Sequence, residues 1–323
     1  MTIQAMLAAR KAIIAAPDNP QPAQPESATI ETKNAAQTNS LMNRSLLDLM
    51  QQVNKAKARS HMTMLLYGAA KTGKTSLAAT IAKLDYIERV WWFDIERGLD
   101  AVILAYQEGR LEERHLAKII PISIADTKQE PLATETLLKA ICGRRPVYID
   151  PTSGKCHDKA ADGLVEFDMT KMTDKDLIVI DSLSQFGQST LNAATLGKPT
   201  EYKLQLDDYG AAQKWGYDLL TTVQAAQRCH FLCITHVRMN EDELGRTTVM
   251  PLMGSSTVSA NVAKHFNTVV YLEKSLKQLK ATSSVLGSVT AQSGSRVGIV
   301  LDKEKDPCLA TSLIEAGYFP ANQ

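Results

Sequence analysis

Apolar runs and helical patterns alternate along the chain from residue 62 onward. The runs are rich in aliphatic and aromatic residues, the pattern of buried strands. They occupy residues 62–67, 90–95, 118–124, 177–180, 230–235, 268–272 and 297–301. Helical patterns cover residues 76–82, 131–142 and 215–223. Strands that alternate with helices predict an α/β fold, in which helices flank a mostly parallel twisted sheet.

The first 60 residues break this pattern. They contain no Phe, Trp or Tyr, and several prolines stand among polar residues between positions 17 and 25. A segment of this composition buries too little apolar surface to offset its ordering entropy. We therefore predict an N-terminal extension over 1–60, with short helices and a disordered linker over 17–40, followed by one domain over 61–323. Within that domain, residues 143–170 have the pattern of an inserted hairpin.

Residues 68–75 read Gly-Ala-Ala-Lys-Thr-Gly-Lys-Thr, which is the form of a phosphate-binding P-loop between a strand and a helix. Successive backbone N–H groups and a helix N-terminus form an anion site in such a loop. Gly68 and Gly73 let the backbone approach the phosphates without a Cβ. Lys74 brings positive charge to the β- and γ-phosphates, and the Thr75 hydroxyl reaches Mg²⁺. The loop predicts binding of a nucleoside triphosphate, ATP, with Mg²⁺. The residues expected at the nucleotide are Gly68, Ala69, Ala70, Lys71, Thr72, Gly73, Lys74, Thr75 and Ser76.

Two carboxylates at the ends of predicted strands complete a candidate hydrolytic site. Asp181 ends the apolar run 177–180, the place from which a P-loop ATPase holds the hydration shell of Mg²⁺. Glu96 follows the strand 90–95, where a carboxylate can orient and deprotonate an attacking water. The alternatives are an ordinary strand-to-turn boundary at Asp181, and a solvated carboxylate paired with Arg97 at Glu96.

A polar pair, His236 and Arg238, follows the strand predicted over 230–235. A polar side chain at such a strand tip can sense the γ-phosphate and move the loop that follows it. The alternative is a partly buried histidine that satisfies the hydrogen bond of a neighbour.

Charge and cysteine content narrow the class of protein. The formal net charge is +1, so no global basic field points to nucleic acid or a membrane surface. Five cysteines without a repeated spacing are typical of reduced thiols in a cytoplasmic compartment. The adjacent Cys156 and His157 lack the second ligand pair that zinc needs. No apolar run reaches the roughly 20 residues of a membrane span. We expect a cytoplasmic protein without zinc or a membrane segment.

The order of these elements resembles the RecA-like recombinase superfamily, and especially its phage-encoded nucleotide-binding proteins, some of which are single-strand annealing or recombination ATPases. The resemblance covers residues 62–306. It rests on the P-loop, a strand ending in Asp-x-Glu-x-x-x-Asp, an aliphatic strand ending in Asp-Ser, and a strand followed by a polar pair with Val-Arg-Met. It implies a RecA-like P-loop NTPase core with antiparallel C-terminal strands. It also implies that Glu96 is the catalytic base and that Asp100 contacts the base or ribose of the nucleotide. His236 stands where the family usually has a glutamine that couples the γ-phosphate to a DNA-binding loop.

The same resemblance implies partners. The two DNA-binding loops of the family correspond to residues 184–206 and 240–262, which are neither strongly basic nor aromatic, so that flexible surface loops are the alternative. The cations expected near single-stranded DNA are Lys198, Lys203, Arg238 and Arg246. In a homo-oligomeric ring or filament, Lys303 and Lys305 are expected to reach the nucleotide of the neighbouring subunit, and a solvated charged turn is the alternative.

We therefore expect an enzyme that binds and hydrolyses ATP and acts on single-stranded DNA in recombination, annealing or replication. Three other functions fit the same core: a hexameric helicase-like motor, a small-molecule or nucleotide kinase, and a nucleotide-gated assembly protein with little turnover. A kinase needs arginines in a closing lid, and residues 183–210 contain none.

Overall fold

A computed structural model gives the fold of the chain. It describes residues 61–143, 145–199, 201–241, 247–275, 278–282, 290–296, 299, 301 and 307–321. All of them belong to the compact unit Lys57–Gln323. The predicted N-terminal extension over 1–60 lies outside the described residues.

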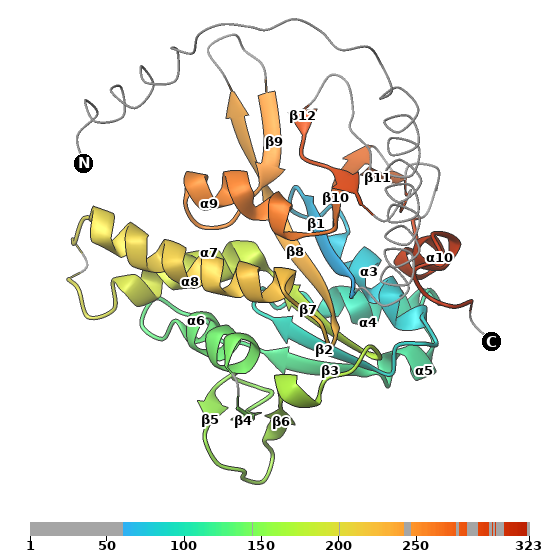
Figure 1. The fold of residues 1–323 in the computed structure, drawn as a ribbon, viewed down its shortest axis with the longest axis horizontal. Helices are drawn as coiled ribbons and strands as arrows, with labels where there is room; N and C mark the ends of the chain where they lie inside the picture. Colours follow the sequence, from blue (N-terminus) through green and yellow to red (C-terminus); the bar gives the residue numbers. More distant parts are fainter. Residues whose placement is uncertain are drawn as a thin grey trace, which may run out of the picture. The chain divides into compact units, whose positions relative to one another are not determined.

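A mostly parallel sheet forms the centre of this unit (Figure 1). Its main strands are β1 Thr63–Gly68, β2 Arg89–Asp94, β3 Ile119–Ser123, β7 Asp176–Asp181, β8 His230–Glu241, β10 Thr268–Ser275 and β11 Gln278–Thr282. They lie in the order β11-β10-β1-β8-β7-β2-β3. The neighbours from β10 to β3 are parallel, and β11 pairs antiparallel with β10. The predicted α/β fold, with a mostly parallel sheet and antiparallel C-terminal strands, is confirmed.

Helices cover both faces of the sheet, which explains why its strands are continuous apolar runs in the sequence. In β1, Leu65 and Tyr67 belong to one buried apolar cluster, and Met64 and Leu66 belong to the other. The first cluster includes residues of α6 Leu132–Leu137, α7 Leu183–Ala194, α8 Leu206–Gln224 and α9 Ser256–Asn261. The second includes residues of α3 Lys74–Ala79, α4 Asp100–Gln107 and α10 Leu309–Glu315.

The remaining elements are short. They are α5 Glu113–Leu116, the 3-10 helices at Thr80–Lys83, Met169–Lys171 and Val262–His265, the π-helical turn Leu138–Cys142, β9 Thr247–Pro251, β12 Thr290–Ala291 and β13 Gly294–Ser295. Within the strand predicted over 297–301, the structure describes only Ile299 and Leu301, which are buried and lie outside any strand. Among the described helices, none combines the length and apolar character that a bilayer crossing requires.

The inserted segment 143–170 contains the two predicted strands, paired antiparallel, together with a third strand that was not predicted. Its strands are β4 Val147–Ile149, β5 Cys156–His157 and β6 Val165–Phe167, and β4 lies in the middle with antiparallel neighbours. Sequence patterns did not indicate β5 because it has only two residues, and it forms where the chain turns at Gly154, whose φ is +78°. The segment therefore contains one strand more than predicted. Two residues are too few to show an alternation of apolar and polar positions.

Strand β8 continues beyond the predicted strand 230–235. Its second half pairs antiparallel with β9, and the register places Val237 opposite Pro251 and Arg238 opposite Met250. The prediction that His236 and Arg238 follow the strand was therefore wrong, because both lie within β8. The extension depends on pairing with β9 across a connection, which a local pattern does not indicate.

The two segments compared with DNA-binding loops contain regular elements. Helix α7 occupies about the first half of 184–206, and β9 and α9 occupy much of 240–262. The resemblance implied a loop over the whole of each segment, and the described parts of both segments are not continuous loops. Only the short connection between α7 and α8 keeps an irregular backbone in the first segment.

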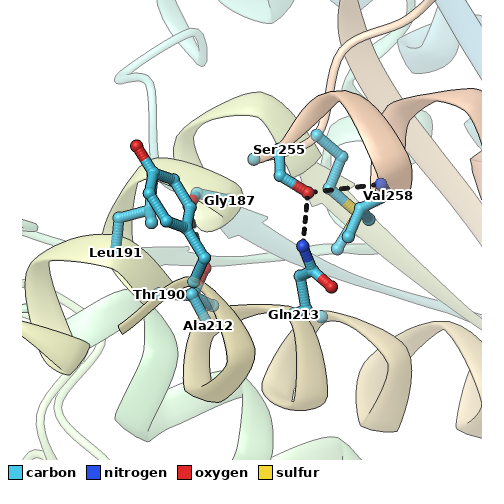
Figure 2. A pocket seen from close by; sticks show the side chains of 11 residues that line it. Gly187, Thr190, Leu191, Ala212, Gln213, Ser255 and Val258 are labelled. Carbon is cyan, nitrogen blue, oxygen red and sulfur yellow. Dashed lines mark hydrogen bonds between the residues drawn. The ribbon is translucent and has the colours of Figure 1, made fainter. Parts of the chain in front are cut away.

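Helix α7 approaches the turn before α9 at two glycines. A Cβ on Gly187 would lie 2.3 Å from the backbone nitrogen of Gly254, so the contact depends on the absence of a side chain. A narrow pocket lies beside it, lined by α7, α8 and the start of α9 (Figure 2). There the Gln213 amide donates a hydrogen bond to the Ser255 hydroxyl (3.1 Å).

Candidate functional site

The P-loop connects β1 to α3, and its two glycines are required for different reasons. Gly73 is the residue before α3 and has a φ of +86°, in the left-handed region that favours glycine. At Gly68, a Cβ would lie 2.4 Å from the carbonyl oxygen of Leu272 on the neighbouring strand β10. The sequence predicted both glycines, but at Gly68 the structure shows that packing against β10 excludes a side chain.

Lys74 is the first residue of α3 and is buried at the loop. Its ammonium group donates hydrogen bonds to the carbonyl oxygens of Gly68 (3.1 Å) and Ala69 (2.7 Å). Burial lowers the pKa of Lys74, and the nearby carboxylates of Glu96 and Asp181 oppose this effect. Phosphate oxygens are charged acceptors and bind an ammonium group more strongly than carbonyl oxygens do. The lysine is therefore positioned for a polyphosphate.

Thr75 and Asp181 form the candidate Mg²⁺ site. Thr75 lies in the helix that follows β1, Asp181 ends β7, and β8 lies between these two strands in the sheet. The Thr75 hydroxyl nevertheless donates a hydrogen bond to Asp181 Oδ2 (2.9 Å). Asp181 is 2% exposed, and burial raises its pKa to about 7. A Cβ on Gly98 would lie 3.2 Å from Asp181 Oδ2 and 3.4 Å from Thr75 Oγ1, so this glycine keeps the space beside both oxygens open.

These residues fit Mg²⁺. The ion prefers oxygen ligands and is usually bound by one or two carboxylates together with substrate phosphates. Thr75 and Asp181 supply such oxygens beside the P-loop. A divalent cation would offset the charge of the buried carboxylate and of the phosphates.

Glu96 lies two residues beyond β2 and is held on both carboxylate oxygens. The Ser182 hydroxyl donates to Oε1, and Nε2 of His236 lies 3.1 Å from Oε2. Burial alone would raise the pKa of Glu96, but the hydrogen bonds from His236 and Ser182 outweigh it and lower the pKa. Among the described residues, the partners of Glu96 are therefore Ser182 and His236, not Arg97 as the alternative proposed. The result is an ionised carboxylate, the form that a general base needs.

The loop that carries Glu96 is fixed by backbone contacts from two strands. The carbonyl oxygen of Asp181 accepts hydrogen bonds from the N–H groups of Ile95 (2.6 Å) and Glu96 (3.3 Å). Asp94 accepts from the Gly98 N–H (2.8 Å), and burial raises its pKa. The sequence analysis assigned no role to Asp94. Its position as the last residue of β2, two residues before Glu96, was the available signal.

His236 connects the two charged groups. Its Nδ1 lies 3.5 Å from the Lys74 ammonium nitrogen, on the opposite side of the ring from Glu96. Its backbone N–H donates to the Ser184 hydroxyl (2.8 Å), and that hydroxyl also shares a hydrogen bond with Thr235 (2.7 Å). The sequence analysis assigned no role to Ser184 and Thr235. The only available signal was a hydroxyl residue near the end of a predicted strand. They attach the start of α7 to β8 and set the position of the imidazole.

One open cleft is lined by Lys74, Thr75, Glu96, Asp181 and His236. Asp100, expected at the nucleotide base or ribose, is exposed at the start of α4, and it is Ala101 that lines the cleft. The lining beyond the P-loop and its helix consists of Lys83, Glu96, Ala101, Glu108, Arg110, Asp181, His236, Lys274, Pro307 and Cys308. The cleft therefore extends from the phosphate loop toward α4 and the start of α10.

Among the other predicted cations, those that the structure describes do not line this cleft. Lys198 and Lys203 belong to the connection between α7 and α8, where the Lys198 ammonium group lies 5.1 Å from the centre of the Tyr202 ring. Arg238 lies in the part of β8 that pairs with β9. Arg246, Lys303 and Lys305 lie outside the described residues.

Comparison with known proteins agrees with a nucleotide-binding domain. No curated protein matches the chain. Two similar solved structures are an ATPase from the type III secretion system of pathogenic bacteria and the RadB recombinase. The first is 12% identical with a TM-score of 0.37, and the match covers 65% of this chain and 51% of that one. The chain thus spans about half the length of that ATPase. RadB is 15% identical with a TM-score of 0.36, and the match covers 68% of this chain and 78% of that one. The family model of the AAA domain matches residues 60–303, which include the P-loop, Glu96, Asp181 and His236, and the chain belongs to this family of P-loop domains.

Proposed function

We propose that this chain binds ATP with Mg²⁺ and hydrolyses it, with Glu96 as the general base. The observation that supports this most directly is the position of the Glu96 carboxylate. It is ionised, held by Ser182 and His236, and lines the same cleft as Lys74 and Asp181.

Each residue has one part in the reaction. Lys74 would bind the β- and γ-phosphates. Thr75 and Asp181 would hold Mg²⁺, which would supply charge neutralisation for phosphoryl transfer. Glu96 accepts the proton of the attacking water as its oxygen bonds to the γ-phosphorus. The bond from that phosphorus to the bridging oxygen breaks, which releases ADP and inorganic phosphate.

We further propose that hydrolysis is coupled to single-stranded DNA in recombination, annealing or replication, and that copies of the chain assemble side by side. His236 supports the coupling, since it contacts both Lys74 and Glu96 and lies in the same strand as Arg238. Arg238 is two residues further along β8, in the half of the strand that pairs with β9. A phosphate bound at this hairpin would act on His236 through a continuous strand.

The test is ATP hydrolysis by the wild type and by Glu96→Gln, with and without single-stranded DNA, at two salt concentrations. Glutamine keeps the size of the side chain but cannot accept the proton. We expect turnover to fall by about 10²–10⁴-fold, the usual contribution of a general base, with unchanged affinity for a fluorescent ATP analogue. Glu130→Gln removes an exposed loop carboxylate and is the matched control. Wild-type turnover in Glu96→Gln would place the base elsewhere.

The measurements with and without DNA distinguish the candidate functions from one another. Stimulation by single-stranded DNA that weakens at high salt supports the DNA-coupled ATPase, because phosphate contacts are salt-dependent. Turnover without stimulation or DNA binding refutes the coupling and retains the ATPase. ATP binding without turnover favours the nucleotide-gated assembly protein. Strand separation of a forked duplex favours the helicase-like motor.

A further inference from the structure

Asp94, the last residue of β2, is a buried carboxylate that the proposed reaction does not use. It is 2% exposed. Its Oδ1 accepts a hydrogen bond from the Gly98 N–H (2.8 Å), and its Oδ2 accepts one from the Leu99 N–H (3.4 Å). A carboxylate is costly to bury unless hydrogen bonds compensate it. Both oxygens of Asp94 are therefore committed to residues 95–99, which we call the Glu96 turn.

The Glu96 turn contains a residue in an unfavourable backbone conformation. Arg97 has a φ of +58°, in the left-handed region that residues with a Cβ rarely adopt. Such a conformation persists only where the surrounding structure fixes it. The two N–H groups that follow Arg97 donate to the carboxylate of Asp94, and successive N–H groups beside a left-handed residue form a concave anion site. Asp94 is thus the internal anion around which the turn folds.

The same turn carries two parts of the candidate site. Glu96 precedes Arg97, and its backbone N–H donates to the Asp181 carbonyl oxygen (3.3 Å). Gly98 follows Arg97, and a Cβ there would lie 3.2 Å from Asp181 Oδ2 and 3.4 Å from Thr75 Oγ1. A change of backbone conformation at Arg97 would therefore shift the candidate base relative to the two candidate Mg²⁺ ligands.

We infer that Asp94 is a positioning residue for hydrolysis: it fixes the Glu96 turn, and the turn holds the Glu96 carboxylate in place at the cleft. Asp94 is not among the described residues that line the cleft, so it acts through the main chain rather than on the nucleotide. Ser182 and His236 hold the carboxylate of Glu96 itself, whereas Asp94 holds the backbone that carries it. This inference deepens the proposed function and rests on it, because it takes Glu96 as the base.

The first test replaces Asp94 with asparagine, which has nearly the same shape but a single acceptor oxygen in its side chain. The amide can accept from only one of the two N–H groups, and its NH₂ group then faces the other. We expect the kcat of Asp94→Asn for ATP hydrolysis to fall by about 10–100-fold, the effect of a displaced catalytic group. Its affinity for a fluorescent ATP analogue should stay at the wild-type value, because Lys74 and the P-loop lie outside the Glu96 turn.

Asp168→Asn is the matched control. Asp168 is also buried and accepts a hydrogen bond from a backbone N–H, that of Thr170 (2.9 Å), but it lies in the inserted segment 143–170. The substitution makes the same chemical change at a residue that does not line the cleft. We expect wild-type kcat. A comparable loss of kcat in Asp168→Asn would show that turnover follows local stability, and would overturn the inference.

The second test changes the turn at Arg97, which is exposed, and keeps Asp94. Arg97→Gly and Arg97→Val both remove the guanidinium group. Glycine adopts the left-handed conformation readily, whereas β-branched valine strongly disfavours it. We expect Arg97→Gly to keep the wild-type kcat and Arg97→Val to lose about 10–100-fold, with the affinity for ATP unchanged in both. Because the position is exposed, this comparison decides the matter even if Asp94→Asn does not fold. Equal kcat values in the two variants would overturn the inference.

The third test repeats Asp94→Asn in the Glu96→Gln background. Residues that act as a unit have strongly non-additive effects on turnover. If Asp94 acts through Glu96, the second substitution should leave the residual kcat almost unchanged. An equal fold-loss in both backgrounds, or a wild-type kcat in Asp94→Asn, would overturn the inference. A wild-type kcat in Glu96→Gln refutes the proposed function, whereas a loss in Glu96→Gln with none in Asp94→Asn refutes only the role of Asp94.

Discussion

Replacing Gly187 with alanine should destabilise the domain, because α7 approaches the backbone of Gly254 at that residue. The added Cβ would lie 2.3 Å from the Gly254 nitrogen and 3.0 Å from the Met253 carbonyl carbon. Ordinary van der Waals contact begins at 3.4 Å, so the backbones must separate by 3.4 − 2.3, or about 1.1 Å. The atoms that must move belong to the main chain, which cannot give way by a change of rotamer.

The magnitude follows from two opposing effects. Overpacking of this kind costs about 3 kcal/mol at its upper end, and alanine in place of glycine inside a helix gains about 1 kcal/mol. We expect Gly187→Ala to lower the free energy of unfolding by about 2 kcal/mol. Gly210 in α8 is the matched control, since its Cβ would meet no atom within 4 Å. Gly210→Ala should gain up to about 1 kcal/mol.

The assay is urea or thermal denaturation followed by far-ultraviolet circular dichroism. For a domain of this size, a loss of about 2 kcal/mol corresponds to a melting temperature about 4–8 °C lower. The two substitutions are chemically identical and both lie in helices, so their difference isolates the contact with Gly254. Equal stability of the two variants, or a more stable Gly187→Ala, would show that α7 does not approach Gly254 in this way.

Three further predictions concern the site and the core. Lys74→Ala should weaken binding of a fluorescent ATP analogue at least about tenfold, since charge-assisted hydrogen bonds are lost; unchanged affinity would contradict the P-loop assignment. Burial lowers the pKa of His230 to about 4, so the unfolded chain, with a histidine pKa near 6.5, binds a proton that the folded chain does not. The free energy of unfolding should therefore fall by up to about 3 kcal/mol as the pH drops from about 6.5 to about 4. Urea denaturation across this pH range should show this fall in the free energy of unfolding of the wild type. An equal fall in His230→Gln would show that His230 is not its cause. Arg89→Met should destabilise the domain by about 2 kcal/mol, because the buried carboxylate of Asp176 loses two hydrogen bonds; unchanged urea denaturation would show that the pair contributes nothing.

Much of the candidate site could be predicted from the sequence because its parts stand at the ends of buried strands. The carboxyl ends of parallel strands meet at one edge of a sheet, so residues that follow such strands lie close together. Asp181 and Glu96 obey this rule, and the P-loop has a spelling that depends on local backbone geometry. In the structure, Thr75 contacts Asp181 directly, and the carboxylate of Glu96 lies against the residue after Asp181.

Contacts between distant segments could not be predicted in the same way. The alternative for Glu96 paired it with its neighbour Arg97, whereas its partners are Ser182, which follows β7, and His236 in β8. The extension of β8 depends on β9, and the insertion gains the two-residue strand β5. None of these features has a periodicity of its own, because each arises from a pairing that exists only after the chain has folded.

The sequence by itself determined the class of fold, the phosphate loop and the two carboxylates, since periodicity and short motifs are local properties of the chain. Only the tertiary structure decided how these parts act together. It placed His236 between Lys74 and Glu96 and brought Gly187 against Gly254. The physical reason is that strand order and helix packing set the distances between residues remote in sequence, and hydrogen bonds and apolar contacts act only at short range.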